Sequence, residues 1–313
     1  MQDIRILFLA PNWRVSLLRL FKKSISGNFF LVGADSDPYS AGLNIVDQKY
    51  VIPQFTEQGC FERIRFICDK ENIDTILPMT NKAIIFMDKN REWFSEEDIA
   101  LYLADHIAIQ ICNDKRSLAG FFNENNIVSP DLVNSNEPYP GFPLIAKEPC
   151  GEGSKNCFKI ESQADLDFYS KKLPNHIFQK FIKGREFSID WFSDKQGVPM
   201  VIVPRERLAT RGGEVMTSRI EMISDIIKSA ENLGTLLKLR GPANLQGILD
   251  EAGSFFFTDV NLRFGSGALH TIHAGADIPR MMFQELVGQP VKIDNSIIDG
   301  SKMFRFHDAI FDS

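Results

Sequence analysis

The sequence has few cysteines, and they form no recognisable pattern. The five, Cys60, Cys68, Cys112, Cys150 and Cys157, are an odd number and include no Cys-x-x-Cys pair. A disulfide framework or a zinc site normally requires paired or closely spaced cysteines, so neither is expected. We therefore expect reduced thiols and a cytoplasmic location.

Long apolar runs and an excess of basic charge are also missing. No stretch approaches the roughly 18 apolar residues of a membrane helix, and the first residues lack a basic leader followed by a cleavage site. The 35 lysines and arginines face 41 acids, which gives a net charge of −6. We expect neither a nucleic acid nor a membrane surface as partner, because both attract cationic proteins.

The remaining composition is that of an ordinary globular protein. Hydrophobic residues make up 44% of the 313 residues and charged residues 24%. This balance excludes disordered and fibrous classes, and the length suits a protein with two lobes.

The first third of the chain alternates short apolar segments with amphipathic ones. Strands are expected at 5–9, 29–33, 50–52 and 73–79, and helices at 13–23 and 61–68. This alternation predicts a parallel sheet with helices on both faces. Asp35 follows the second strand as a ribose-binding acid would. However, the first turn, A-P-N-W-R-V, has no glycine, so the G-x-G-x-x-G fingerprint of a nicotinamide dehydrogenase is absent.

From about residue 112 the pattern changes to that of an α+β unit. Asp114 is a typical helix N-cap residue and opens a helix that ends near 125–126. Strands are expected at 142–147, 157–160, 177–182, 186–192, 198–203, 246–249 and 255–260, the last two as a hairpin. Between them, residues 220–237 carry apolar residues at helical spacing, and Asp277 reads as the N-cap of a late helix.

Several residues of this second unit suit phosphate binding. Gly151 and Gly153 let backbone N–H groups approach an anion, and Ser154 adds a hydroxyl. Lys115 and Lys147 could neutralise the same phosphates. Each feature has a plainer alternative, because glycine-rich hairpin tips and solvated lysines are common.

A metal site is suggested by D-V-N-L-R near residue 260. Asp259 and Asn261 lie two apart on a strand, so both side chains emerge on one face, and Gln246 lies on the neighbouring strand. Carboxylate and amide oxygens suit Mg²⁺. Arg263 follows, where a planar cation could bind a phosphoryl or carboxylate group. The alternative is an exposed strand face.

In this order the pieces resemble the ATP-grasp superfamily, and most of all the large-subunit type of carbamoyl-phosphate synthase. V-G-A-D-S-D-P at Val32–Pro38 and I-D-T-I-L-P at Ile73–Pro78 resemble the family's N-terminal domain. The resemblance implies an α/β plus α+β protein. A Rossmann-like pre-ATP-grasp domain would span residues 1–111. An ATP-grasp domain would follow over 112–313, divided into a lid-bearing part (112–182) and a metal-bearing part (183–313).

The resemblance also implies roles for the site residues. Lys115 and Lys147 would contact the phosphates of ATP, Gln179, Lys180, Phe181 and Ile182 would hold adenine, and Glu186 would bind the ribose. Gln246, Asp259 and Asn261 would hold Mg²⁺, with Mn²⁺ as the alternative, and Arg263 and Lys147 would act in catalysis. Three residues depart from the family pattern: Asp259 replaces Glu, Leu262 replaces Pro, and Gln179 stands where an acid is common.

Two further groups are candidates for substrate contacts. Arg205, Arg207, Arg211 and Arg219 surround a Gly-Gly pair between an expected strand and an expected helix, where they could bind a substrate carboxylate; the alternative is a solvated hairpin. His270 and His273 have the spacing for i,i+3 ligation, but a place in a loop cap or the core is the alternative.

The family chemistry implies an ATP-dependent ligase. A small carboxylate would be activated as an acyl phosphate with release of ADP, and an amine would then displace phosphate. The alternative is a regulatory nucleotide-binding module without turnover. The chain is too short for a complete carbamoyl-phosphate synthase, which carries two such units, and a homodimer is expected from the resemblance.

Overall fold

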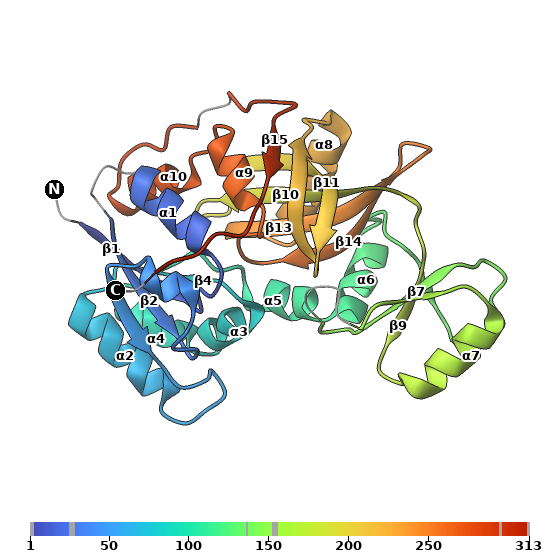
Figure 1. Cartoon of the computed structure of the whole chain (residues 1–313), viewed down its shortest axis with the longest axis horizontal. Helices are drawn as coiled ribbons and strands as arrows, with labels where there is room; N and C mark the ends of the chain where they lie inside the picture. The colour runs from blue at the N-terminus through green and yellow to red at the C-terminus, as the bar shows by residue number, and fades with distance from the viewer. Residues whose placement is uncertain (1–2, 25–28, 136, 152–155, 294–295, 312–313) are drawn as a thin grey trace.

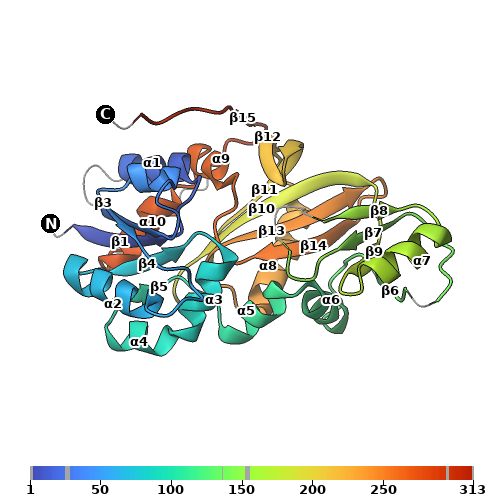
Figure 2. The ribbon, with the colours of Figure 1, turned by 60° about the horizontal axis from the view of Figure 1, so that its bottom comes forward.

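The computed structural model describes residues 3–24, 29–135, 137–151, 156–293 and 296–311. Its described strands form three sheets of five, six and four strands. Figures 1 and 2 show the five-stranded sheet at one end of the molecule, the four-stranded sheet at the other, and the six-stranded sheet between them. In the part of the chain that the structure describes, no helix combines the length and apolarity needed to cross a membrane.

The N-terminal sheet is parallel, as the alternation of segments predicts. Its strand order is β3-β2-β1-β4-β5. The strands are β1 (Ile4–Leu9), β2 (Phe29–Asp35), β3 (Gln48–Val51), β4 (Thr75–Pro78) and β5 (Ala100–Leu101). The helical segments are α1 (Val15–Ser24), η1 (Ala41–Asn44), α2 (Cys60–Glu71), α3 (Asn81–Lys89), α4 (Arg91–Glu96) and α5 (His106–Asn113).

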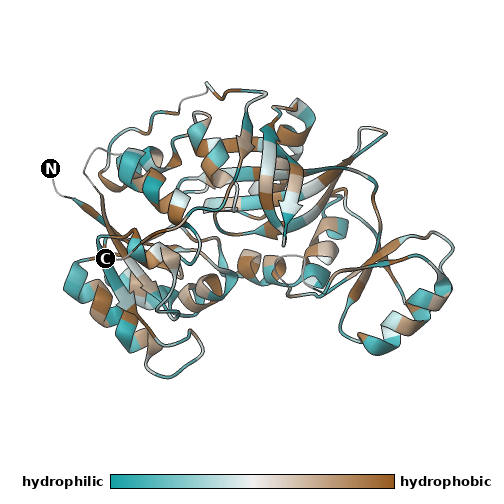
Figure 3. Ribbon diagram, viewed as in Figure 1, coloured by the Kyte–Doolittle hydropathy of each residue, from teal (hydrophilic) through white to brown (hydrophobic). Residues whose placement is uncertain are grey.

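Both faces of this sheet are covered, because its strands carry apolar side chains on both sides. Leu7 and Leu9 pack in one core with α2, α3 and α5. Ile6 and Phe8 point to the other face and pack with α1 and with α10 (Ile278–Leu286), which comes from the far end of the chain. Figure 3 shows hydrophobic residues along the strands and mixed surfaces on the helices that cover them. The late helix therefore completes a face that the first third of the chain leaves open.

The six-stranded sheet is antiparallel, with the order β14-β13-β10-β11-β12-β15. The strands are β10 (Gly184–Ser193), β11 (Pro199–Arg211), β12 (Glu214–Ile220), β13 (Gly241–Asp250), β14 (Phe255–Asn261) and β15 (Lys302–Phe304). Its remaining helices are α8 (Ser224–Leu236) and α9 (Ala268–His273). The predicted hairpin is confirmed: β13 and β14 pair directly, with a register shift next to Gln246.

The four-stranded sheet, with the order β6-β9-β7-β8, has a core of its own. It contains β6 (Leu132–Val133), β7 (Leu144–Lys147), β8 (Phe158–Ile160) and β9 (Ile177–Lys180), with α7 (Gln163–Lys172) packed on it and α6 (Lys115–Glu124) preceding it. Leu144, Ile160, Leu166 and Phe178 form its small cluster. The two larger clusters each combine residues of the N-terminal and six-stranded sheets. The predicted boundaries at 111 and 182 stay predictions.

The segment 204–237 holds one correction and one alternative that the sequence left open. The arginine-rich stretch lies in a hairpin of β11 and β12, which was that alternative, although its Arg205 is buried rather than solvated. The helix expected from residue 220 begins at Ser224, because Ile220 ends β12 with its side chain buried. The apolar stripe itself is confirmed, since Ile226, Ala230 and Leu233 are buried.

Candidate active site

A cavity of about 710 Å³ lies where the three sheets meet; we call it the main cavity. It is lined by fourteen of the predicted site residues: Lys115, Lys147, Gly151, Gln179, Lys180, Phe181, Ile182, Glu186, Arg205, Arg207, Gln246, Asp259, Asn261 and Arg263. Arg211 lines a neighbouring cavity instead. Gly153 and Ser154 lie outside the described residues.

Two lysines approach the main cavity from the small sheet and the helix before it. Asp114 caps α6 by accepting hydrogen bonds from the backbone N–H groups of Arg116 (2.7 Å) and Ser117 (3.1 Å), which fixes Lys115 at the first helical position. Lys115 Nζ donates to the carbonyl oxygen of Gly151 at 2.9 Å. Lys147 ends β7, and its Nζ lies 3.4 Å from the carbonyl oxygen of Thr258 on β14.

The environment of Lys147 favours an anion. Burial lowers the pKa of Lys147 below its ordinary value of 10.5, the charge of Lys115 lowers it further, and Asp259 opposes both effects. Two cations held together in a partly dry cavity repel each other, and a bound polyanion would relieve that repulsion. This half of the cavity is therefore suited to phosphate groups.

The strand β9 pairs with β7, which carries Lys147, and its end supplies a further wall of the cavity. Gln179 is buried, and its amide donates to the carbonyl oxygen of Pro130 at 3.3 Å. The backbone N–H of Lys180 donates to Asp131 (3.0 Å) and that of Phe181 to Pro143 (3.2 Å). These donors are already used inside the protein, so a ligand on this wall would meet the remaining backbone groups and the apolar side chain of Ile182.

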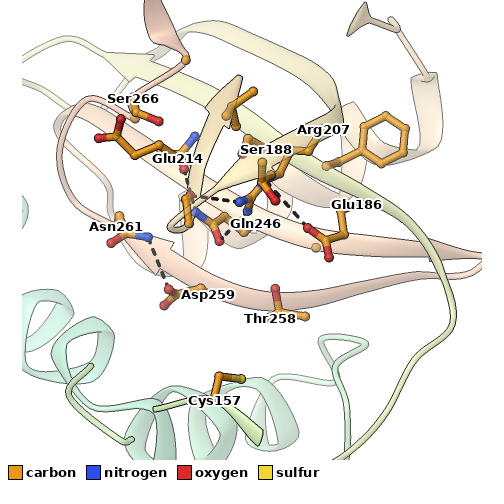
Figure 4. Close-up of a pocket in the computed structure, with 18 of the residues that line it drawn as sticks. Cys157, Glu186, Ser188, Arg207, Glu214, Gln246, Thr258, Asp259, Asn261 and Ser266 are labelled. Atoms are coloured by element: carbon orange, nitrogen blue, oxygen red, sulfur yellow. Dashed lines mark hydrogen bonds and ion pairs between the residues drawn. The ribbon is translucent and has the colours of Figure 1, made fainter. Parts of the chain in front are cut away.

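Polar side chains of the six-stranded sheet form the floor (Figure 4). Arg207 donates to Gln246 Oε1 at 3.3 Å and to the carbonyl oxygen of Gly213 at 3.1 Å, and it lies 3.8 Å from Glu186. Gln246 in turn donates to Asn244 at 3.1 Å. Glu186 is thus the exposed member of this connected chain of side chains.

Asp259 and Asn261 lie on one face of β14, as their spacing predicts (Figure 4). Asn261 Nδ2 donates to Asp259 Oδ2 at 3.4 Å, and Gln246 is the cross-strand partner of Asp259. Among the described residues, no group of three His, Cys, Asp or Glu side chains could hold a metal ion. One carboxylate with a neighbouring amide oxygen still fits Mg²⁺, which takes its other ligands from water and phosphates. Gln246 fits less well, because its Oε1 faces the cation of Arg207.

Arg263 stands at the junction with the N-terminal sheet. Its Nε lies 3.2 Å from Asn81 Oδ1, at the start of α3, and its Nη1 lies 3.3 Å from the carbonyl oxygen of Phe264. Asn12, Trp13 and Arg14, in the glycine-free turn after β1, line the same cavity. Asp35 supports that turn by accepting from the N–H of Asn12 at 3.2 Å, a structural use that differs from ribose binding.

A buried ionic network that the sequence did not indicate lies under the floor. The fully buried Arg205 donates to both carboxylate oxygens of Asp190, at 3.1 and 3.4 Å, and Asn244 and Thr271 donate to the same carboxylate at 3.1 and 2.6 Å. Arg205 Nη1 is buried and has no hydrogen-bond partner among the described residues. The guanidinium predicted to bind substrate is therefore mainly occupied by Asp190.

Two glycines after Arg263 let the chain pass over this network. A Cβ at Gly267 would lie 2.4 Å from the guanidinium carbon of Arg205, and one at Gly265 would lie 2.7 Å from Asn244 Nδ2. Only residues without a side chain fit such contacts. The G-S-G motif that follows Arg263 was the available signal for this close packing.

The two histidines, His270 and His273, lie in different environments. His270 is buried between the hydroxyls of Ser218 (2.9 Å) and Ser301 (3.1 Å), and burial, aided by the charge of Arg205, lowers its pKa to about 4. His273 is exposed. The pair therefore does not form the i,i+3 ligand site that its spacing allowed, and His270 is a core residue.

Two family models match this chain. The model described as "PylC-like, N-terminal domain" matches residues 6–109, and the model described as "ATP-grasp in the biosynthetic pathway with Ter operon" matches residues 172–304. The first range covers the N-terminal sheet and the second covers the six-stranded sheet. Residues 110–171, with Lys115, Lys147 and Gly151, lie outside both matches.

Comparison with known proteins found similarity in sequence and in fold. A carbamoyl-phosphate synthase of Methanobrevibacter smithii is 24% identical over 165 residues, a match that covers 50% of this chain and 44% of that protein, so the chain spans less than half of its length. The L-amino acid ligase of Bacillus licheniformis is similar in structure with a TM-score of 0.72, at 17% identity and with 91% of this chain and 75% of that chain covered. For the ADP complex of N5-carboxyaminoimidazole synthetase from Staphylococcus aureus the TM-score is 0.74, at 11% identity and with 97% and 81% covered.

Proposed function

We propose that this chain is an ATP-grasp protein that acts as an ATP-dependent ligase and joins a small carboxylate to an amine. The observation that carries the proposal is the meeting of Lys115, Lys147, Asp259 and Arg263 around one cavity, although they come from separate parts of the chain. A cationic, partly buried cavity with metal-ligating oxygens suits a nucleoside triphosphate. The chain has no need of a protein nucleophile for such a reaction, because positioning and charge stabilisation supply most of the catalysis.

In this proposal the nucleotide lies along the small sheet. Lys115 and Lys147 bind the phosphates, and Gly151, Gly153 and Ser154 are proposed as further phosphate contacts. Adenine lies on the wall formed by Gln179, Lys180, Phe181 and Ile182. Its hydrogen-bond partners are the backbone carbonyl groups of this wall and the backbone N–H of Ile182. Glu186 binds the ribose hydroxyls, which fits its exposed carboxylate beside the cavity.

Asp259 and Asn261 are the proposed protein ligands of Mg²⁺, or of Mn²⁺ in its place. The ion supplies positive charge to the phosphate oxygens of the nucleotide when bound. Gln246 would have to leave Arg207 before it could coordinate, so we assign it to orienting that arginine. Water and the nucleotide phosphates would supply the remaining ligands of Mg²⁺.

The reaction proceeds in two displacements. A carboxylate oxygen of the substrate attacks the γ-phosphorus, the bond from that phosphorus to the β,γ-bridging oxygen breaks, and ADP leaves. The amine then attacks the acyl carbon, phosphate departs with the electron pair of its C–O bond, and the nitrogen loses a proton as the amide forms. Lys147 and Arg263 stabilise the charge on the transferring phosphoryl group and on the acyl phosphate.

The proposal is tested by ADP release in the presence of Mg-ATP. We expect release to require one pair from a panel of amino acids, other small carboxylates and amines, with bicarbonate and ammonia included. Asp259→Ala and Lys147→Ala should each lower turnover by about 100-fold or more while circular dichroism stays unchanged. Lys228→Ala and Glu231→Ala, on the exposed side of α8, are the matched controls and should retain activity.

Two results would contradict the proposal. ADP release at the wild-type rate from either site variant would separate turnover from this cavity. Binding of ATP without release for any pair in the panel would favour a regulatory nucleotide-binding module.

A further inference from the structure

A second cavity, of about 920 Å³, opens beside the main one; we call it the side cavity. The two share the lining residues Trp13, Arg14, Gly212, Glu214, Gly265 and Ser266. Figure 4 shows Glu214 and Ser266 close together at one side of the main cavity, away from Cys157 and Thr258. A ligand that reaches Arg263 from the side cavity would therefore pass between the turn after β1 and the tip of the β11–β12 hairpin.

The charge of the side cavity is positive. Its lining holds four arginines, Arg14, Arg19, Arg211 and Arg305, against the two acids Glu214 and Asp308. Both acids already pair with arginines, Glu214 with Arg305 at 3.2 Å and Asp308 with Arg19 at 3.9 Å. The exposed guanidinium of Arg211 instead faces a ring nitrogen of His307 at 3.4 Å. This leaves a guanidinium at the tip of the hairpin in position to bind an anion.

Aromatic rings surround the same space. Trp13, Tyr39, Phe304 and Phe306 line the side cavity and are between 70% and 90% exposed. They come from three distant segments: the turn after β1, the loop before η1, and the stretch from β15 toward the C-terminus, which crosses beside α1 in Figures 1 and 2. Single exposed rings are ordinary, but rings from separate segments around one basic cavity provide stacking surfaces for a planar group.

From these contacts we propose that the substrate bound on this side is an elongated molecule with an aromatic ring and an anionic group distant from its reacting end. The ring lies among Tyr39, Phe304 and Phe306, and the anion, a carboxylate or a phosphate, binds Arg211. The reacting end lies in the main cavity near Arg263. This inference rests on the proposed function for the reaction, but the binding it describes involves residues of the side cavity.

The test uses the full chain loaded with Mg²⁺ and β,γ-methylene-ATP, with calorimetry as the measurement. The probes are L-phenylalanine, L-glutamate, 4-carboxy-L-phenylalanine and O-phospho-L-tyrosine, which separate ring, charge and their combination. We expect one of the last two to bind about ten-fold tighter than either of the first two. The tighter of the two identifies the anion as carboxylate or phosphate.

Variants then assign the preference to the side cavity. Arg211→Gln should abolish the advantage of the combined probe over L-phenylalanine, and Tyr39→Ala should reduce its advantage over L-glutamate several-fold. Arg280 is an exposed arginine on α10, and Arg280→Gln is the matched control. It should change neither of these two advantages in affinity. Neither site variant should alter the affinity for the ATP analogue.

Two outcomes overturn the inference: no preference for the combined probes, or a preference that persists in both site variants. The affinity for the ATP analogue, measured on the same samples, distinguishes its failure from that of the proposed function. Nucleotide binding together with ADP release for an unrelated pair would leave the ligase standing and reject only this substrate class. If the wild-type chain does not bind the ATP analogue, the proposed ligase function is rejected. The affinities of the probes would still test the binding proposed for the side cavity.

Discussion

Gly267 has a precise steric role, because its missing side chain makes room for a buried guanidinium. Arg205 cannot move away, since it is fully buried and held by Asp190. Gly267→Ala should therefore lower the free energy of unfolding by about 1–3 kcal/mol, as overpacking does. Gly120→Ala is the matched control: nothing lies within 4 Å of its added carbon in α6. It should leave stability unchanged or raise it by up to about 1 kcal/mol. Equal losses in urea unfolding of both variants would contradict this packing.

The lowered pKa of Lys147 predicts an effect of pH on nucleotide binding. As pH rises through that pKa, the ammonium of Lys147 loses its proton. The affinity for ATP should therefore begin to decrease at a pH lower than 10.5, the ordinary lysine pKa. Lys147→Arg keeps its charge and should bind with little change over the same range. Without nucleotide, the unfolded chain binds more protons at Lys147 than the folded protein does at pH values between the lowered pKa and 10.5. The free energy of unfolding should therefore rise with pH over that range. Calorimetric titrations across pH test this; an equally flat wild-type profile would contradict it.

The charged residues that line the main cavity could be selected from the sequence because their chemistry is visible in short motifs. Lys147, Asp259 and Asn261 end or occupy strands whose pattern is clear, so the sequence indicates which face they share. Asp190 and Arg205 could not be paired in this way, since they are fifteen positions apart and meet only through the pairing of β10 and β11. Trp13 and Arg14 were also missed as lining residues, because their place depends on how the N-terminal sheet packs against the six-stranded one.

The helix α6 positions Lys115 through its cap. Asp114→Ala would remove the acceptor for the N–H groups of Arg116 and Ser117, at a cost of about 1 kcal/mol. We expect a matching fall in stability and a weaker affinity for ATP, because the first turn would fray around Lys115. Asp114→Asn retains the capping oxygen and should recover most of both. Equal defects in the two variants, measured by thermal unfolding and nucleotide titration, would show that capping is not the cause.

Strands with clear apolar patterns were predictable, whereas the helices of residues 81–113 were not identified from the sequence. In α5, Ile107 is exposed while its neighbours Ala108 and Ile109 are buried, so the sequence alone does not reveal which side is inward. The late start of α8 has a similar origin. Ile220 fits the apolar stripe of the helix by spacing, but pairing of β12 with β11 holds it in the sheet.

At the scale of the whole molecule, the described residues form two cores that each span the N-terminal and six-stranded sheets, and one separate core in the small sheet. Leu166 belongs to the separate cluster of the small sheet, and Leu233 to a cluster that spans both larger sheets. Leu233→Ala should lower global stability by about 2–5 kcal/mol. Leu166→Ala should mainly speed hydrogen exchange in β7, β8, β9 and α7, leaving the principal unfolding transition nearly unchanged. The same global loss in both variants would contradict independent opening of the small sheet.

That separation has an evolutionary consequence. The walls contributed by the turn after β1 and by the β11–β12 hairpin are anchored in the shared cores, while the wall over the lysines belongs to an independently packed unit. Point changes at hairpin tips could redirect which acceptor is admitted without disturbing how the nucleotide is enclosed. Under the proposed function, such changes would alter the product while the use of ATP stays the same.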